Sequence, residues 1–324
     1  MTVAILGAGA FGTALAVTLG KKAKKVVLWS RTKEHAVQLN KDMENKRHLK
    51  GIKFSNKIVS THNLKFACEQ VDAVLICIPA QQINTFFNEN FSFLPKVPLI
   101  ICSKGIDAKT SLLQTDIIKK YIPDSTLAVL TGPSFASEIA VGLPTALTLA
   151  CEDSETCFTM QKLLSNPTLR IYTSSDIISA QLGGALKNVV AIACGMVKSA
   201  SLGENARISV MTRGFNEIIK LGIAMGGDQK TFYGLSGLGD LCLTCNSMLS
   251  RNFLLGFNFN SNKTLHKKIT VEGIETARAA VSLMKTYRID APVISSVHKI
   301  LTKNVSVSIA MEELLSRPLK EELI

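Results

Sequence analysis

The chain has 324 residues, enough for two domains of ordinary size, and 47% hydrophobic with 19% charged residues is typical of a globular protein. Its 37 basic and 25 acidic residues leave a net charge of +12, which favours anionic partners such as phosphorylated small molecules. The basic residues occur in short scattered runs, such as the one at 20–25, and form no basic-aromatic stripe. We therefore expect no nucleic-acid partner.

Two further features bear on the compartment. No apolar run approaches the roughly 18 residues needed to span a bilayer, and the first strand begins almost at Met1, so we expect no membrane insertion and a cytoplasmic protein. Most of the eight cysteines lie in apolar runs, where a free thiol behaves as a small hydrophobic group. Cys242 and Cys245 form a lone CxxC without a second pair at zinc-site spacing, so we expect a structural role and no metal.

The first element predicted is a strand at 2–6 that leads into a glycine-rich turn and then a helix. In this setting the pattern GxGxxG is typical of dinucleotide binding, because the helix N-terminus offers N–H groups and partial positive charge to a pyrophosphate. Gly7 permits the tight turn, Gly9 lets the backbone approach the ligand, and Gly12 allows the helix to pack closely on the strand. The turn predicts a Rossmann domain.

The second strand, 25–30, ends without the acidic residue that usually holds the ribose 2′-hydroxyl of NAD. Trp29, Ser30 and Arg31 stand there instead, and a guanidinium can pair with a 2′-phosphate. We therefore expect NADP(H) as cofactor, with use of NAD(H) left open. The alternative for Arg31 is a solvated residue that opens the next helix.

Six more apolar runs predict strands within 57–60, 73–79, 97–105, 126–132, 145–150 and 168–174. Such continuous apolar runs suit strands covered on both faces, and ligands bind at the carboxyl ends of strands in open α/β sheets. Lys104 follows one of these strands directly and is placed to meet an anion or a carbonyl oxygen. We predict a doubly wound, Rossmann-like α/β domain over 1–175.

Helical patterns dominate after Thr173 and predict a mainly α-helical domain over 176–324. The stretch at 180–196 is apolar on nearly all sides except for Lys187. A buried ammonium costs several kcal/mol or lowers its pKa unless a partner compensates it, whereas a lysine at a helix edge reaches solvent easily. A glycine-punctuated turn further on carries one carboxylate, Asp240, which is the candidate partner.

Several motifs resemble those of the bacterial type of NAD(P)-dependent glycerol-3-phosphate dehydrogenases, in the same order and spacing. They are GAGAFGTALA, SKGI, GPSFA, LKNVVAIACG, GLSGLGDLCLTC, SRN and VEG. The resemblance extends from residue 2 to beyond 310. One loop departs from the family, because His48 and Lys50 stand where an aromatic residue and a proline are usual.

The resemblance implies reduction of dihydroxyacetone phosphate to sn-glycerol 3-phosphate, a precursor of phospholipids. It also implies roles for individual residues. The implied catalytic group is Lys187, the acid/base, with Asn188, Lys104, Asp240 and Thr244. The implied cofactor-binding residues are Gly7, Gly9, Ala10, Phe11, Gly12, Arg31, Lys104, Ala136, Arg251 and Glu272. The implied substrate-binding residues are Lys104, Gly132, Ser134, Lys187, Asp240, Ser250, Arg251 and Asn252.

Three alternatives remain at this point. A β-hydroxyacid dehydrogenase of the 6-phosphogluconate or hydroxyisobutyrate type also combines a Rossmann domain with a helical domain, but GPSFA and SRN argue against it. A regulatory protein that senses NADP(H) without turnover would have no reason to keep Lys104, Lys187 and Asp240 together. Nucleic-acid binding driven by the net charge would depend steeply on salt. The sequence does not decide the oligomeric state, and a homodimer is compatible with it.

Overall fold

The computed structural model describes residues 1–259, 271–303 and 305–318. Contacts within the chain divide it into two compact units: residues 1–103 with 114–177, and residues 104–113 with 178–324. The short segment Lys104–Leu113 therefore packs with the second unit, although it lies within the first 175 residues of the sequence. Lys104 is its first residue, so it belongs to the same unit as Lys187.

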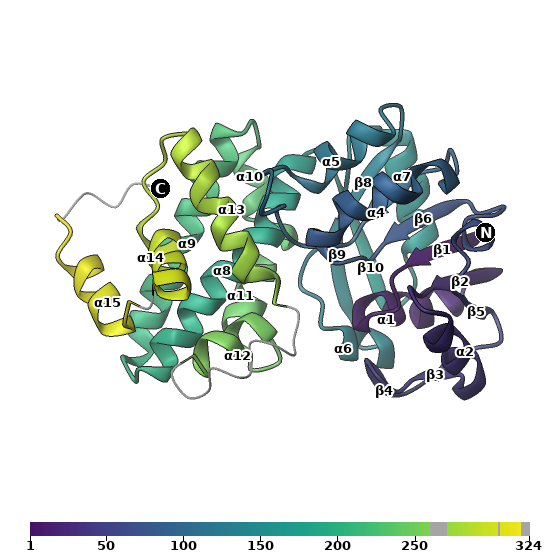
Figure 1. The fold of residues 1–324 in the computed structure, drawn as a ribbon, viewed down its shortest axis with the longest axis horizontal. Coiled ribbons are helices and arrows are strands. Elements are labelled where there is room, and N and C mark those ends of the chain that lie inside the picture. Colours follow the sequence, from purple (N-terminus) through teal and green to yellow (C-terminus); the bar gives the residue numbers. More distant parts are fainter. Residues whose placement is uncertain (260–270, 304, 319–324) are drawn as a thin grey trace. The chain divides into compact units, whose positions relative to one another are not determined.

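The first unit, all of whose residues are described, is built on an eight-stranded sheet in the order β10-β9-β8-β7-β6-β1-β2-β5 (Figure 1). All neighbouring strands pair in parallel except β8 and β9, which are antiparallel. The strands are β1 (Thr2–Leu6), β2 (Lys25–Trp29), β5 (Ile58–Thr61), β6 (Ala73–Ile76), β7 (Leu99–Ile101), β8 (Leu127–Thr131), β9 (Thr145–Cys151) and β10 (Leu169–Ser174). All eight strands predicted from apolar runs are confirmed.

Helices flank this sheet, and a small hairpin lies beside two of them. The helices are α1 (Ala10–Gly20), α2 (Lys33–Asp42), α3 (Leu64–Ala67), α4 (Ile83–Asn90), α5 (Gln114–Tyr121), α6 (Ala136–Val141) and α7 (Ser154–Leu164), with 3-10 turns η1 (Ala80–Gln82) and η2 (Phe91–Phe93). The antiparallel hairpin β3 (Glu44–Asn45) and β4 (Leu49–Lys53) packs against α1 and α2. The stretch around His48 was expected to be a loop, and the structure pairs its two arms as this hairpin.

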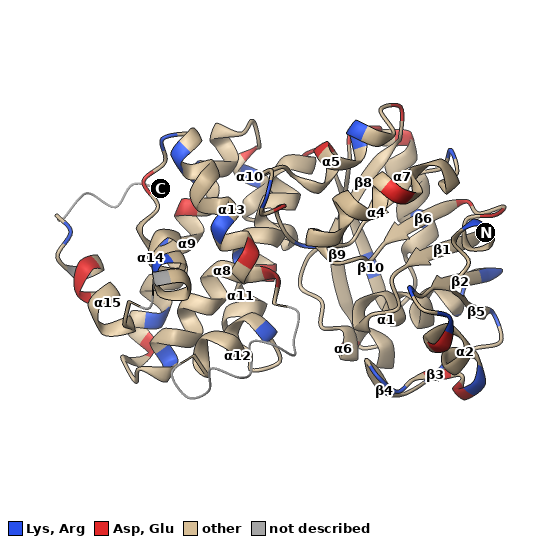
Figure 2. Cartoon of the chain, in the orientation of Figure 1, with Lys and Arg blue, Asp and Glu red and all other residues tan. Residues whose placement is uncertain are grey.

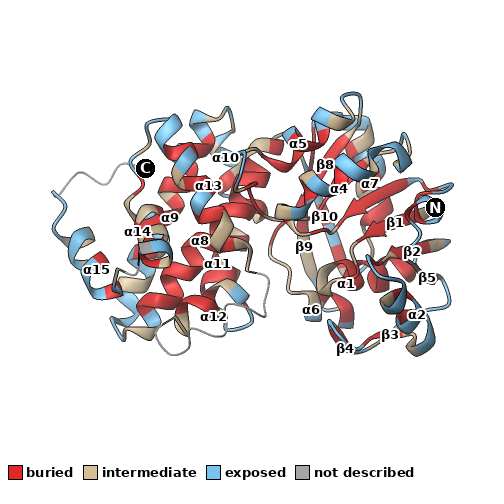
Figure 3. Ribbon diagram, in the orientation of Figure 1, coloured by how far each residue is buried: buried red, intermediate tan, exposed pale blue. Residues whose placement is uncertain are grey.

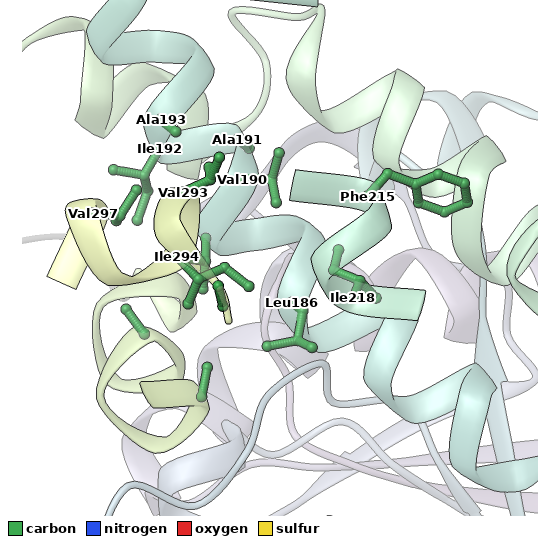
Figure 4. Close-up of a cluster of buried hydrophobic side chains, with 14 of the residues drawn as sticks. Leu186, Val190, Ala191, Ile192, Ala193, Phe215, Ile218, Val293, Ile294 and Val297 are labelled. Carbon is green, nitrogen blue, oxygen red and sulfur yellow. The ribbon is translucent and has the colours of Figure 1, made fainter. Parts of the chain in front are cut away.

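The regular elements of the second unit are all helices among its described residues, and the segment 104–113 is irregular. The unit contains α8 (Ile177–Ser199), α9 (Gly203–Ala224), α10 (Gln229–Phe232), a π-helical turn η3 (Leu235–Gly239), α11 (Asp240–Cys245), α12 (Arg251–Phe257), α13 (Glu272–Thr286), α14 (Pro292–Lys303) and α15 (Val307–Leu315). Apolar side chains of α8, α9 and α14 form its core, among them Val190, Ile218 and Ile294 (Figure 4). The expected Rossmann-like fold with a mainly helical C-terminal part is confirmed.

Helix α8 runs through the core of this unit and is buried along most of its length (Figure 3). Its length and mean hydropathy of 1.5 would suffice to span a membrane, so the expectation that no segment of the chain reaches this threshold is wrong. However, 94% of its most apolar window is buried inside the structure, as in the core helix of a globular protein. Its apolar composition is therefore explained by packing.

Helices α8 and α12 cross at backbone contact. A Cβ atom on Gly195 would lie 2.1 Å from the carbonyl oxygen of Phe253, and one on Gly256 would lie 2.0 Å from that of Ile192. Both positions therefore require glycine, because no other residue allows the two backbones this close. The crossing fixes the start of α12 relative to the middle of α8, where Lys187 lies.

Candidate active site

Lys187 lies in the middle of α8, and only 6% of its surface is exposed. It therefore does not reach solvent as a lysine at a helix edge would. Its ammonium donates hydrogen bonds to Oδ1 of Asp240 and, at 2.8 Å, to Oγ1 of Thr244. These two acceptors compensate the charge that the apolar helix buries.

Asp240 joins two lysines. While its Oδ1 accepts from Lys187, its Oδ2 accepts from Nζ of Lys104 at 2.7 Å. The carboxylate is completely buried, and Thr244, one turn later on α11, donates its hydroxyl hydrogen to the Asp240 carbonyl oxygen at 2.6 Å. Two ammonium groups thus share one carboxylate, which leaves a net charge of +1 where an anion or a developing alkoxide could be stabilised.

The pKa of Lys187 is lowered from 10.5 to about 8. Burial is the main cause, since it penalises the charged form, and the nearby ammonium of Lys104 lowers the pKa further. The carboxylate of Asp240 opposes both effects. A lysine with a pKa near 8 can both donate and accept a proton close to neutral pH, which is the property that a general acid/base needs.

The side-chain amides of Asn188 and Asn252 form a chain of hydrogen bonds, called the relay below, next to Lys187. Asn188 donates to the carbonyl oxygen of Lys104 at 3.4 Å and accepts at Oδ1 from Asn252 at 2.9 Å. Oδ1 of Asn252 accepts the N–H of Gly273, near the start of α13, at 3.1 Å. The relay therefore connects α8, α12, α13 and the segment carrying Lys104. Sequence reasoning placed Asn188 and Asn252 in the site but did not predict that they bind each other.

The neighbours of Asn252 are arranged around the N-terminus of α12. Ser250 is buried, and its Oγ accepts the N–H of Phe253 at 3.2 Å, so it caps the helix. Arg251 is exposed on the first turn. Glu272 is half-buried and begins α13, next to Gly273. The structure thus brings Lys104, Lys187, Asn188, Asp240, Thr244 and Asn252 into one network, and it places Ser250, Arg251 and Glu272 next to members of that network along the chain.

In the first unit, the glycine-rich turn has the geometry that a dinucleotide requires. Gly7 has φ of +119°, and a Cβ there would lie 2.6 Å from the carbonyl oxygen of Cys77. The space beside Gly9, the N-cap of α1, is open, because a Cβ there would meet nothing within 4 Å. No side chain caps α1, and its first turn carries no acid. Its N–H groups therefore fit a pyrophosphate.

Other residues assigned to this cofactor site surround the turn and the next strand end. Ala10 and Phe11 form the first turn of α1, and Gly12 packs against the turn itself, where a Cβ would lie 2.1 Å from the Gly7 carbonyl oxygen. Gly7 donates its N–H to the carbonyl oxygen of Trp29 at 3.1 Å, so the turn adjoins the end of β2. Arg31 is exposed two residues further on.

Sequence reasoning missed Asn45, which supports this turn from the β3–β4 hairpin. It is completely buried, and its Nδ2 donates to the carbonyl oxygen of Ala8 at 3.0 Å and to Oγ1 of Thr13 at 2.8 Å. An asparagine inside a polar, lysine-rich stretch carries no pattern that predicts such a contact. The contact depends on the packing of the hairpin against α1.

The segment after β8 carries the remaining predicted residues. Ser134 donates its hydroxyl hydrogen to the carbonyl oxygen of Gly132 at 2.8 Å, which closes the turn between β8 and α6. Ala136 begins α6. Gly132, Ser134 and Ala136 all belong to the first unit.

A dinucleotide turn on a doubly wound sheet, together with a helical unit that buries a lysine paired with a carboxylate, is typical of nicotinamide-dependent oxidoreductases. The family described as NAD-dependent glycerol-3-phosphate dehydrogenase matches the chain with its N-terminal part over residues 2–157 and its C-terminal part over 176–312. The chain belongs to this family, and it is an NAD(P)-dependent enzyme acting on a small molecule.

Individual relatives agree over nearly the full length. The chain is 44% identical over 323 residues to glycerol-3-phosphate dehydrogenase [NAD(P)+] of Ruegeria sp., covering 99% of this chain and 100% of the relative. It is 40% identical to that of Rhodospirillum rubrum, covering 99% and 93%. The crystal structure of glycerol-3-phosphate dehydrogenase from Coxiella burnetii superimposes with a TM-score of 0.93 at 33% identity, covering 98% and 99%. Among the alternatives raised from the sequence, these matches decide in favour of the glycerol-3-phosphate dehydrogenases.

Proposed function

We propose that the protein interconverts dihydroxyacetone phosphate and sn-glycerol 3-phosphate, using NADPH in preference to NADH, and so supplies glycerol 3-phosphate for phospholipid synthesis. The first unit carries the dinucleotide turn, and the second carries the proton donor and most of the proposed substrate-binding groups. The observation that carries this proposal is the buried Lys187–Asp240–Lys104 cluster. The eight cysteines of the protein are free thiols, which suits a reducing compartment and a cytoplasmic enzyme.

When bound, the reduced nicotinamide supplies a hydride to the carbonyl carbon of the substrate. The carbonyl oxygen then gains negative charge, and the ammonium of Lys187 stabilises this charge and donates a proton to the oxygen, leaving a neutral amine. Asp240 holds Lys187 in place and keeps its pKa from falling further, and Thr244 fixes the direction of the ammonium through its hydrogen bond. In the reverse reaction, neutral Lys187 removes the proton from the alcohol.

The phosphate end of the substrate requires cationic and hydrogen-bonding groups. We propose that Arg251 and Asn252 provide them at the start of α12, because a guanidinium grips a phosphate through parallel hydrogen bonds. Lys104 has a second role here, since its ammonium contributes to the positive charge around the reacting oxygen. By the family resemblance alone, we assign Gly132 and Ser134 to substrate binding, and Arg31, Ala136 and Glu272 to cofactor binding.

The proposal is tested by following NADPH oxidation spectrophotometrically with dihydroxyacetone phosphate. In the oxidative direction, NADP+ is supplied with sn-glycerol 3-phosphate, 6-phosphogluconate or hydroxyisobutyrate. We expect turnover with the first two substrates only. Faster oxidation of either acid than of sn-glycerol 3-phosphate would contradict the proposal.

A further inference from the structure

Two histidines lie where the adenosine end of the cofactor is expected, and the mechanism above uses neither. His35 is half-buried in the first turn of α2, and its Nδ1 is 2.9 Å from Oγ of the buried Ser30, the first residue after β2. His48 is exposed on the β3–β4 turn, and its ring contacts that of His35 edge-on at 5.8 Å between centroids. The His48 ring is exposed to solvent, whereas Nε2 of His35 is buried and has no hydrogen-bond partner among the described residues.

The hairpin that carries His48 is fixed to the dinucleotide turn. The backbone N–H of His48 donates to Oδ1 of Asn45 at 3.2 Å, and Nδ2 of the same asparagine binds the Ala8 carbonyl oxygen within the glycine-rich turn. His48 is therefore held between the turn that fits a pyrophosphate and the end of β2. In a Rossmann domain the ribose next to the adenine lies at the end of β2, and its 2′ position carries the phosphate that distinguishes NADP from NAD.

Basic residues outnumber acidic ones six to three over residues 31–50, and Figure 2 shows both signs on α2 and the β3–β4 hairpin. Arg47 lies close enough to His35 to affect its titration, and Arg31, Lys33 and Glu34 precede His35 along the chain. β5, which packs against α2, carries no charged residue.

Two acids of the neighbouring segments have cationic partners of their own. Glu44 accepts from Lys53 at 2.7 Å and from the N–H of Gly51, and Asp42 pairs with Lys46 at 3.1 Å. Glu34 is the remaining acid beside this site, and it is exposed to solvent. The region therefore suits an anion.

We propose that His35 and His48, together with Arg47, recognise the 2′-phosphate of NADP(H) in a proton-dependent way, so that the protein selects NADPH over NADH more strongly as the pH falls from 8 to 6. This inference rests on the cofactor use proposed above.

The direction of the effect follows from the chemistry of the two groups. Burial lowers the pKa of His35 below 6.5, and the guanidinium of Arg47 lowers it further, while the Asn45 side chain opposes them. In the free protein the ring is thus mostly neutral at pH 7. A dianionic phosphate beside it favours the imidazolium, so NADPH binding takes up a proton and becomes tighter as the pH falls. Protonation of the phosphate itself, with a pKa near 6, limits the effect at lower pH.

The experiment measures dissociation constants of NADPH and NADH by fluorescence titration between pH 6 and 8, without substrate. Uptake of one proton changes a dissociation constant by at most about tenfold per pH unit. We expect NADPH to bind about tenfold tighter at pH 6 than at pH 8, with NADH changing less than about twofold. In the double variant His35→Asn, His48→Tyr, the NADPH dependence should fall to that of NADH. His62→Gln, at another exposed histidine of the first unit, is the matched control and should behave as the wild type.

A second measurement avoids dependence on the variants. In an NMR titration of the histidine rings of the wild-type protein, NADP+ should raise the pKa of one or both cluster histidines, and NAD+ should not. A ratio of NADH to NADPH dissociation constants that stays constant from pH 6 to 8 would overturn the inference, as would unchanged histidine titrations with NADP+. Because no dihydroxyacetone phosphate is present, a protein that shows the expected binding but no turnover contradicts the proposed reaction and supports this inference.

Discussion

Replacing Lys187 by methionine separates the chemical from the structural role of the buried lysine. The pKa of Lys187 is about 8 instead of 10.5, and each unit corresponds to about 1.4 kcal/mol. Keeping the lysine charged in the folded state therefore costs about 3 kcal/mol at pH 7. Methionine fills similar space without charge, while Asp240 keeps its ion pair with Lys104. We expect Lys187→Met to be as stable as the wild type or more stable.

The pH dependence of stability provides a check on this reasoning. The folded-state pKa is the lower one, so between pH 8 and 10.5 the unfolded chain binds more protons at this site than the folded chain. Wild-type stability should therefore gain a contribution from this site as the pH rises through that interval, and the variant should lack it. Thermal unfolding of both proteins at pH 7 and 9.5 measures the difference.

Although Lys187→Met should not destabilise the fold, it should greatly reduce turnover. Loss of general acid catalysis costs ~10²–10⁴-fold, and loss of electrostatic stabilisation of the alkoxide adds about as much. The assay is kcat for dihydroxyacetone phosphate reduction, with the NADPH dissociation constant measured in parallel and expected to stay nearly unchanged. Lys198→Met, at an exposed lysine on the same helix, is the matched control. A Lys187→Met protein within tenfold of the wild-type rate would refute the assignment of Lys187 as proton donor.

Four further outcomes are expected. Because reduction needs the ammonium and oxidation the amine of Lys187, kcat for reduction should fall above about pH 8 while kcat for oxidation rises toward it, as pH–rate profiles in both directions will test. Arg31→Ala should weaken NADPH binding by about 1.5–3 kcal/mol more than NADH binding, and equal losses would contradict its contact with the 2′-phosphate. Arg251→Lys should raise KM for dihydroxyacetone phosphate or cofactor with the melting temperature unchanged; unaltered kinetics would make it a surface residue. The Glu217 carboxylate accepts the N–H groups of Val293 and Ile294, and burial raises its pKa to about 7. Its contribution to the free energy of unfolding should therefore decrease as the pH rises from 4.5 through 7. Glu217→Gln should remove that decrease, as measured by calorimetry.

The main sheet could be predicted strand by strand, because each strand is a short apolar run bounded by turn residues. The antiparallel direction of β9 could not, since an apolar run reads the same in both directions. The β3–β4 hairpin was missed because its residues are polar and its pairing depends on contacts with α1 and α2. The segment at 104–113 follows a strand of the first unit and yet packs with the second, which no local pattern indicates.

The candidate site shows the same limit. The need of Lys187 for a carboxylate follows from the cost of burying charge, and Asp240 was the acid available in the neighbouring motif. The second oxygen of Asp240 accepts a hydrogen bond from Lys104. This contact depends on how the segment at 104–113 packs against α11, which no local sequence pattern indicates. The pairing of Asn188 with Asn252 likewise depends on the distance between α8 and α12, and an amide side chain carries no sign of which partner it will find.

The backbone contact between α8 and α12 at Gly195 and Gly256 has a consequence for redesign of substrate scope. Because no atoms lie between the two backbones that could be trimmed, the spacing of Lys187 and Asn252 cannot be adjusted by resizing side chains at the crossing. A library aimed at longer polyol phosphates should therefore leave both glycines untouched and vary the residues at the helix start instead. Substitutions at Gly195 or Gly256 are expected to give unfolded protein, because any Cβ there would lie within about 2.1 Å of a backbone oxygen.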